Sequence, residues 1–278
     1  MSKCSILIPN RYTWDSIILA VESIRKRTRG IETEIIVCDN SMALNNRAVE
    51  PKTGETIDGD NGNRLEWLKE QARLGNIRLI ENADQKPLYG HGENLKKLIA
   101  ACDTEYAMLF TSTAEITRRD WLMALINLMP TTRDIGVAKF RPGGVHDNTM
   151  LRPPLYWPNM MMLNMAVYRS SERANDWDLE IMPYLEFPYP NIFHGDVKAR
   201  AIIPNNPLVF CDTGWRFWAR IWMDNPLGLR VQPLPDNYWN SYIIWRGGID
   251  RNSHRPSHPH VQNTLAAVKQ RLNKLRTE

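Results

Sequence analysis

Short apolar runs alternate with helical segments through the first 130 residues, and this alternation constrains the fold more than any other feature of the sequence. The runs have the length of buried strands, and they cover residues 5–9, 34–40, 77–82 and 104–110. The helical segments cover residues 13–27, with Thr13 as the expected N-cap, and residues 65–74, 93–101 and 116–129. We predict an α/β fold, a mainly parallel sheet covered by helices with its ligand crevice at the carboxyl ends of the strands.

Periodicity is weaker in the second half of the chain, where residues 141–210 hold many of the 18 prolines. Here we predict two strands, within residues 160–169 and 228–235, and two helices, over residues 213–223 and 261–275. In the first half, residues 41–63 are rich in Asn, Gly, Asp and Thr and predict a long polar loop. A chain of 278 residues fits one compact domain whose second half is irregular.

Composition excludes several classes of protein. Apolar residues make up 43% of the chain, yet no apolar run nears the roughly 18 residues of a membrane span, and the first twenty residues lack the pattern of a signal peptide. The four cysteines (Cys4, Cys38, Cys102 and Cys211) are far apart and lie in or beside apolar runs. This spacing favours buried free thiols over a disulfide framework, and we expect a cytoplasmic protein.

Two short motifs suggest enzyme classes that the rest of the chain excludes. GHGENL at Gly90 has two of the three glycines of a dinucleotide fingerprint, but it follows its strand only after a full loop, which excludes a Rossmann dehydrogenase. Asp212, Thr213 and Gly214 form the triplet of aspartic proteases. Those enzymes need two such aspartates, and this chain has one copy, which excludes a protease.

Five segments, in order, resemble the family 2 inverting glycosyltransferases with the GT-A fold, and the likeness runs from residue 5 to about residue 251. The segments are SILIPNRYTWDSIILAVESIRKRT, EIIVCDNS, IRLIENADQKPLYGHGENLKKLIAACDTEYAMLF, CDTGWRFWARIWMDNPLGLRVQPLP and WRGGIDR. The resemblance implies that residues 1–130 form a nucleotide-sugar-binding half. Residues 131–278 would form an acceptor-binding half that ends in a basic helix.

The resemblance also implies roles for individual residues. Pro9, Asn10 and Arg11 would form the nucleotide loop, Asp39 would bind the base, and Asn94 would stand at the family's Asn position in the donor site. Asp212 would act as the catalytic base. Two plainer readings remain open, because Asp39 at a strand end could cap a turn and Asp212 could cap the helix that follows it.

One departure from the family pattern concerns the metal. The family carries a D-x-D motif for Mg²⁺ or Mn²⁺ after its fourth strand, and here Thr111, Ser112 and Thr113 stand in that place. Hydroxyls are poor ligands for a hard divalent ion. The family's later metal-binding His is replaced by Trp245. Either basic side chains neutralise the diphosphate in place of the metal, or the site is inactive, although Glu115 could still bind a metal weakly.

Other polar and aromatic residues complete the predicted sites. The candidates to neutralise the diphosphate are Lys86, Arg246 and Arg251. The acceptor candidates are His194, Asp196 and Trp215. Because Trp215 shares helical spacing with Trp218 and Trp222, a packed face is the favoured reading for it.

We predict a hexosyl- or pentosyltransferase that uses a nucleotide-sugar donor, with a UDP-sugar expected, and that has little or no dependence on metal. The acceptor stays open between a saccharide or glycolipid and a hydroxymethylated base in DNA, as in phage-type enzymes. A non-catalytic nucleotide-sugar or nucleic-acid binding module is the rival from another class.

Residues 246–278 carry a charge of +5 from seven Lys and Arg against two acids, which suggests that this end contacts an anionic surface. Lys269, Arg271, Lys274 and Arg276 are expected to face outward there.

Overall fold

The structure is a computed structural model of the chain. It describes residues 3–10, 13, 15–40, 47–49, 56–58, 64–82, 90–146, 150–156, 158, 160–170, 177, 180–211, 213–223, 227–235, 238, 241–245 and 259–278.

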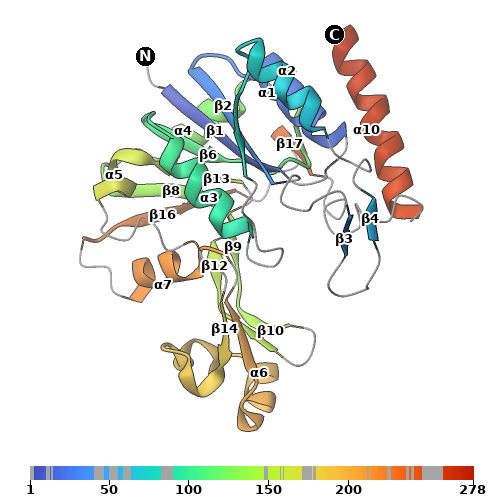
Figure 1. Cartoon of the computed structure of the whole chain (residues 1–278). Coiled ribbons are helices and arrows are strands. Elements are labelled where there is room, and N and C mark those ends of the chain that lie inside the picture. Colours follow the sequence, from blue (N-terminus) through green and yellow to red (C-terminus); the bar gives the residue numbers. More distant parts are fainter. Residues whose placement is uncertain are drawn as a thin grey trace.

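A central sheet of seven strands organises the fold, in the order β16-β8-β13-β6-β1-β2-β5 (Figure 1). Its strands are β1 (Lys3–Asn10), β2 (Glu32–Asp39), β5 (Arg78–Glu81), β6 (Tyr106–Leu109), β8 (Asp134–Ala138), β13 (Met161–Asn164) and β16 (Arg230–Pro233). The four strands from the first half are mutually parallel, and β13 runs antiparallel to both of its neighbours. The predicted α/β fold with a mainly parallel sheet is therefore confirmed.

Helices cover both faces of this sheet, because apolar side chains of each strand alternate between two cores. Ile6 and Ile8 face one core, and Leu7 faces the other. The first core is covered by α1 (Asp15–Arg27), α2 (Leu65–Arg73), α4 (Trp121–Ile126) and α10 (Pro259–Thr277). The second is covered by α3 (Gly90–Ala101), α5 (Met165–Ser170) and α7 (Trp215–Met223). Because helices cover both faces of the sheet, the carboxyl ends of its strands are where polar side chains can gather.

A second, smaller sheet forms a lobe below the central sheet in Figure 1. Its order is β10-β11-β15-β14, with bounds β10 (Gly144–His146), β11 (Met150–Arg152), β14 (Glu180–Pro183) and β15 (Leu208–Cys211). Short helices complete the lobe: η2 (Tyr184–Glu186), η3 (Pro190–Phe193), α6 (Val197–Ile202) and η4 (Ile203–Asn205). A third core holds it together, and Phe187, Phe193 and Trp215 are among its buried members. Much of the proline-rich region therefore belongs to a lobe with its own aromatic core, while Met161–Asn164 belong to the central sheet.

Three two-stranded pairs complete the strands that the structure describes. They are β3 (Arg47–Val49) with β4 (Thr56–Asp58), β9 (Phe140–Arg141) with β12 (Leu155–Tyr156), and β7 (Ala114–Ile116) with β17 (Ile243–Trp245). The first pair corrects the predicted loop over residues 41–63, because the alternation over three residues is too short to identify a strand. The third pair corrects the predicted helix over residues 116–129, since Ile116 ends a strand and the helix α4 begins only at Trp121.

Several predicted boundaries shift. Strand β13 ends at Asn164 and gives way to α5, where a single strand was predicted. Gly90 and Gly92 lie in the first turn of α3 rather than before it. Helix α1 begins at Asp15, and the hydroxyl of Thr13, the predicted cap, donates to Asn10 Oδ1 at 2.5 Å.

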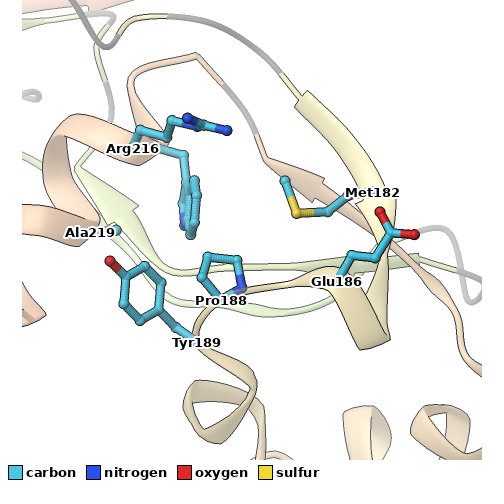
Figure 2. Close-up of a pocket in the computed structure, with 7 residues that line it drawn as sticks. Met182, Glu186, Pro188, Tyr189, Arg216 and Ala219 are labelled. Atoms are coloured by element: carbon cyan, nitrogen blue, oxygen red, sulfur yellow. The ribbon is translucent and has the colours of Figure 1, made fainter.

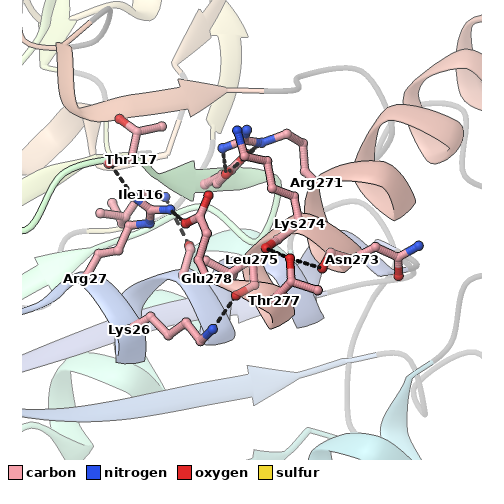
Figure 3. A network of polar contacts seen from close by, with 12 residues as sticks. Lys26, Arg27, Ile116, Thr117, Arg271, Asn273, Lys274, Leu275, Thr277 and Glu278 are labelled. Carbon is pink, nitrogen blue, oxygen red and sulfur yellow. Dashed lines mark hydrogen bonds and ion pairs between the residues drawn. The ribbon is translucent and has the colours of Figure 1, made fainter.

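The C-terminal helix α10 packs against α1 and is part of the core. Val268, Leu272 and Leu275 are at most 5% exposed, and burial of each such side chain contributes about 1.5–3 kcal/mol. Figure 3 shows the polar network at its end, where Lys26 donates to the carbonyl of Leu275 and Arg27 pairs with Glu278.

The prediction that the basic residues of this helix face outward is wrong for Arg271, which pairs with a buried carboxylate, whereas Arg276 forms a surface ion pair and is 51% exposed. Arg276 pairs with Glu22 at 2.9 Å, and Arg271 pairs with Glu115 at 2.6 Å. Lys269 and Lys274 are exposed. The excess charge of this end is therefore partly used to hold the helix on the domain.

The four cysteines are free and buried, as predicted. Burial raises the pKa of the thiols of Cys38 and Cys211 to about 12. Among the residues described, no helix has the length and apolar character needed to cross a membrane.

Candidate functional site

Asn10 and Asp39 lie at the carboxyl ends of two neighbouring parallel strands, β1 and β2, where their Cα atoms are paired in register. Asn10 Nδ2 donates to Asp39 Oδ1 at 2.7 Å, and the Thr13 hydroxyl donates to Asn10 Oδ1. Asp39 is fully buried and Asn10 is 2% exposed. This chain of hydrogen bonds fixes the orientation of the Asp39 carboxylate at the strand ends, where α/β sheets bind ligands.

A second cluster of amides lies one strand further along the sheet. Asn82 follows β5, and its backbone N–H donates to the Asp39 carbonyl at 2.8 Å. Asn82 Nδ2 donates to Asn94 Oδ1 at 2.8 Å, and Lys97 Nζ donates to Asn82 Oδ1. Cys38 Sγ also donates to Asn94 Oδ1, at 3.4 Å. Asn94 is thus a buried residue that ties helix α3 to the edge beside Asp39.

Thr111, Ser112 and Thr113 form a tight turn at the carboxyl end of β6, the strand on the other side of β1. The hydroxyls of Thr111 and Thr113 are 3.0 Å apart, and the N–H of Ala114 donates to the Thr111 carbonyl at 3.3 Å. The turn therefore points both threonine hydroxyls toward each other. Because β1 lies between β2 and β6, this turn and Asp39 flank the end of the same strand.

The turn leads into β7, which pairs with a segment more than a hundred residues later. Trp245 is paired in register with Ala114, and Ile244 with Glu115. The two places where the sequence departs from the family's metal ligands, Thr111–Thr113 and Trp245, are therefore brought side by side. The resemblance stated above named each of these places separately, and the pairing of β7 with β17 brings them together.

Glu115 is fully buried and binds Arg271 of α10 through two nitrogens. Nε lies 3.0 Å from Oε1, and Nη2 lies 2.6 Å from the same oxygen. The hydrogen bond that Arg271 donates to Glu115 raises the pKa of the Arg271 guanidinium above its ordinary value. The carboxylate that was named as a weak metal ligand is thus already neutralised by a fixed cation.

The donor atoms that the structure describes in this site do not fit a divalent metal. Across the described ranges, no three His, Cys, Asp or Glu side chains gather closely enough to hold a metal ion. Thr111 and Thr113 offer neutral hydroxyls, and hard divalent ions need charged oxygens. Glu115, the nearby carboxylate, is committed to Arg271.

The three acceptor candidates all lie in the lobe. Trp215 begins α7 and is 2% exposed, packed against Phe187 with ring centroids 5.0 Å apart, so the predicted packed face is confirmed for it. His194 is exposed at the end of η3. Asp196 caps α6, because its Oδ1 accepts from the N–H of Ala199 at 2.9 Å. The acceptor roles of His194 and Asp196 stay predictions.

Trp215 lines a hollow of about 390 Å³ in the lobe, together with side chains from β14, the segment after η2, and α7. The other lining residues are Met182, Glu186, Pro188, Tyr189, Arg216 and Ala219. Figure 2 shows Pro188 between Tyr189 and Glu186, with Arg216 across the hollow from them. Neither His194 nor Asp196 lines it.

Five of the predicted site residues lie outside the described part of the chain: Arg11, Lys86, Asp212, Arg246 and Arg251. The residues on either side of Asp212 are described. Cys211 ends β15 fully buried, Thr213 is 2% exposed, and Gly214 adopts a φ of +81°. At Gly214 a Cβ atom would lie 2.9 Å from the ring of Trp177, so only glycine fits this approach to α7.

The sequence analysis did not identify three residues of the hydrogen-bonded cluster around Asp39 at the strand ends, namely Thr13, Asn82 and Lys97. It also did not identify Arg271 as the partner of Glu115. Asn82 ends a predicted strand next to the one that carries Asp39, so its place at the edge was a readable signal. The sequence held no signal for the pairing of Arg271 with Glu115, because 156 residues separate them and no local pattern links residues so far apart.

A comparison with known protein families finds no matching family, and no curated protein matches the chain. Among solved structures, the chain is similar to S. aureus TarS (residues 1–349) in complex with UDP, with 11% identity and a TM-score of 0.40 over 75% of this chain. It is also similar to the mannosyltransferase PcManGT from Pyrobaculum calidifontis in complex with GDP-Man and Mn²⁺, with 10% identity and a TM-score of 0.44 over 99% of this chain and 73% of that chain.

A third similar structure is glucosyl-3-phosphoglycerate synthase from Mycobacterium tuberculosis in complex with Mn²⁺, UDP and phosphoglyceric acid. The identity is 18% and the TM-score 0.34, over 51% of this chain. This chain spans 57% of the length of the TarS chain and 44% of the mycobacterial one.

Proposed function

We propose that this protein is a GT-A-type glycosyltransferase that binds a nucleotide-sugar at the ends of β1, β2 and β6 and transfers the sugar to an acceptor hydroxyl. One observation carries the proposal. The segments that resemble the family's nucleotide loop, base-binding aspartate and metal motif end on three adjacent strands, at Asn10, Asp39 and Thr111.

The arrangement suits a nucleoside diphosphate. Asp39 is held by Asn10 in one orientation and offers a buried carboxylate that can accept hydrogen bonds from a base. The Thr111–Thr113 turn on the other side of β1 offers hydroxyls and a backbone turn where the diphosphate would lie. As the family resemblance implies, the nucleotide loop of Pro9, Asn10 and Arg11 would lie between the base at Asp39 and the diphosphate at the turn. Asn94 would hold Asn82 in place beside Asp39 through their hydrogen bond.

Transfer in this proposal requires little or no metal. A departing nucleoside diphosphate develops negative charge, and one cation about 4 Å away stabilises it by roughly 4 kcal/mol at an effective dielectric constant near 20. Because the donor set does not fit Mg²⁺ or Mn²⁺, we assign this role to the basic residues Lys86, Arg246 and Arg251. Arg246 follows Trp245 directly, and Trp245 is paired with the strand that leaves the Thr111–Thr113 turn.

The proposed reaction is a single displacement with inversion, as the resemblance implies. Asp212 takes the proton of the acceptor hydroxyl while that oxygen forms a bond to the anomeric carbon. The bond from the anomeric carbon to the diphosphate oxygen breaks, and the nucleoside diphosphate leaves with the electron pair. General-base catalysis of this kind contributes about 10²- to 10⁴-fold to the rate.

Donor turnover tests the proposal directly. UDP-, GDP- and TDP-sugars are incubated with the protein, and release of each nucleoside diphosphate is measured with the wild type and with Asp212→Asn. We expect at least one donor to be hydrolysed by the wild type and the variant to lose at least 100-fold in rate while it keeps its donor affinity. Thr213→Ser serves as the control, because it changes the neighbouring residue and preserves its hydroxyl.

Failure of every donor to turn over would contradict the enzyme assignment and favour a non-catalytic binding module. Near-normal turnover by Asp212→Asn would leave the transferase assignment in place and reduce Asp212 to a helix cap.

A further inference from the structure

The hollow in the lobe has the features of a preformed ligand site. Its volume of about 390 Å³ falls in the range of about 300–1,000 Å³ that is typical of small-molecule pockets. Aromatic and aliphatic side chains line most of it, with Glu186 and Arg216 as the charged residues. We propose that this hollow binds a saccharide and is the acceptor subsite of the enzyme. This inference rests on the proposed transferase function.

The wall of the hollow is rigid because it is an extension of the aromatic core of the lobe. Tyr189 packs on Trp215 with ring centroids 6.0 Å apart, and Phe187 packs on both, at 5.0 Å from Trp215 and 6.3 Å from Tyr189. Trp215 and Ala219 are at most 3% exposed. A ligand that enters would therefore meet a surface already in place and would not have to order it.

One charged residue of the hollow is fixed as well. Arg216 binds Glu180 through two nitrogens, with Nε 2.8 Å from Oε2 and Nη2 2.7 Å from Oε1. This ion pair holds the guanidinium at the rim, on the side of the hollow opposite Pro188 (Figure 2).

The chemistry of the lining suits a sugar ring. A pyranose has a face of C–H groups, which packs on aromatic and proline surfaces, and a rim of hydroxyls, which bind charged groups. Tyr189 and Pro188 supply the first kind of surface, and Glu186 and Arg216 supply the second. Such a combination of apolar wall and few polar groups fixes both the affinity and the orientation of a small ligand.

Local charge separates a neutral saccharide from a nucleic acid or an anionic lipid. Among the described residues of the hollow and its ion pair, there are two carboxylates, Glu180 and Glu186, and one cation, Arg216. A polyanion would be repelled by this excess of negative charge, since binding of nucleic acid depends on neutralising phosphates with Lys and Arg. The lining therefore favours a neutral saccharide over the DNA base that the sequence left open.

The position of the hollow also fits an acceptor. Glu180 on β14 is paired in register with Cys211, the residue before Asp212. Trp215 follows Asp212 by three residues and lines the hollow. A saccharide bound here would contact Trp215, three residues after the predicted base, and Met182 on the strand that pairs with the residues before it.

Saccharide binding without any donor tests the inference. A panel of neutral mono- and disaccharides is titrated by saturation-transfer NMR into the wild type, Tyr189→Ala and Glu186→Gln. Leu185→Ala is the matched control, because Leu185 is 80% exposed and does not line the hollow. We expect at least one saccharide to bind the wild type and the control equally and to bind each pocket variant at least tenfold more weakly.

The conservative Glu186→Gln keeps the test decisive if Tyr189→Ala fails to fold, because Glu186 is exposed. The inference is overturned if no saccharide of the panel binds, or if Glu186→Gln binds as well as the wild type. It is also overturned if a duplex DNA oligonucleotide or an anionic vesicle binds and the pocket variants weaken that binding. Donor hydrolysis is measured in a separate experiment. If no donor is hydrolysed, the transferase assignment fails, and the saccharide-binding result still stands by itself.

Discussion

The ion pair between Glu115 and Arg271 gives a prediction whose size follows from the structure. Glu115 is fully buried, while the Arg271 side chain is 28% exposed. Removing one partner of a buried pair leaves an uncompensated charge, at a cost of about 3–5 kcal/mol. Because solvent reaches Arg271, we expect the lower end of that range, about 3 kcal/mol, for Arg271→Met.

The double variant Glu115→Leu/Arg271→Met removes both charges and should lie within about 1 kcal/mol of the wild type, because a buried pair replaced by apolar residues is often neutral. Arg276→Met on the same helix is the matched control. Its partner Glu22 is 20% exposed and Arg276 itself is 51% exposed, so its loss should cost at most about 1 kcal/mol.

Urea unfolding followed by circular dichroism measures all four proteins, and melting temperature provides a second readout. A loss of about 3 kcal/mol corresponds to a fall of about 6 °C for a chain of this size. Our reasoning is refuted if Arg271→Met costs less than 1 kcal/mol, or if the double variant is as unstable as Arg271→Met.

Three further predictions concern acid stability, the cysteines and the basic helix. Burial alone would raise the pKa of Asp134, but hydrogen bonds from Thr131 and Gln232 outweigh it and lower the pKa below its ordinary value. The ionised Asp134 carboxylate therefore stabilises the folded state above about pH 4, and this contribution is lost as the pH falls and the carboxylate is protonated. Asp134→Asn should cost about 1–2 kcal/mol in urea melts at pH 7 and much less at pH 2.5, and equal costs at both pH values would contradict this. Burial also raises the pKa of the Cys38 and Cys211 thiols and shields all four cysteines, so labelling with a thiol reagent at pH 8 should be slow in the folded protein and fast in urea; rapid labelling before urea is added would contradict this prediction. Replacing Lys269 and Lys274 with Gln should make the salt dependence of any binding to DNA or anionic vesicles shallower without lowering stability, and an unchanged slope would show that this helix does not contact the anion.

Local sequence patterns predicted the strands of the first half because each is a short apolar run between helical segments. The strand β8, with the sequence DIGVA, has the same apolar character but was missed, because Gly136 interrupts it. The structure explains this glycine: a Cβ atom there would lie 2.4 Å from the carbonyl oxygen of Met162 on the neighbouring strand. The glycine that permits this close approach of two backbones thus interrupts the apolar run by which the strand would be recognised in the sequence.

The parallel sheet predicted from the sequence brings strand ends to one edge, and Asn10 and Asp39 lie there with their Cα atoms paired in register. The fate of Glu115 was not predictable in this way. The sequence suggested Glu115 as a weak metal ligand, whereas a helix from the far end of the sequence supplies the cation that it binds. Contacts of that kind depend on tertiary packing, which no local period encodes.

Binding of a nucleoside diphosphate in the absence of metal tests the central claim most directly. UDP, GDP and TDP are titrated calorimetrically into the wild type and Asp39→Asn, with chelator and with Mn²⁺. We predict that at least one nucleotide binds the wild type, that chelator weakens this binding less than tenfold, or about 1.4 kcal/mol, and that Asp39→Asn weakens it more than tenfold. If chelator abolishes binding, the site uses a metal that its donor atoms do not suit. If none of the three nucleotides binds with or without Mn²⁺, the assignment of this edge as a nucleotide-sugar site is wrong.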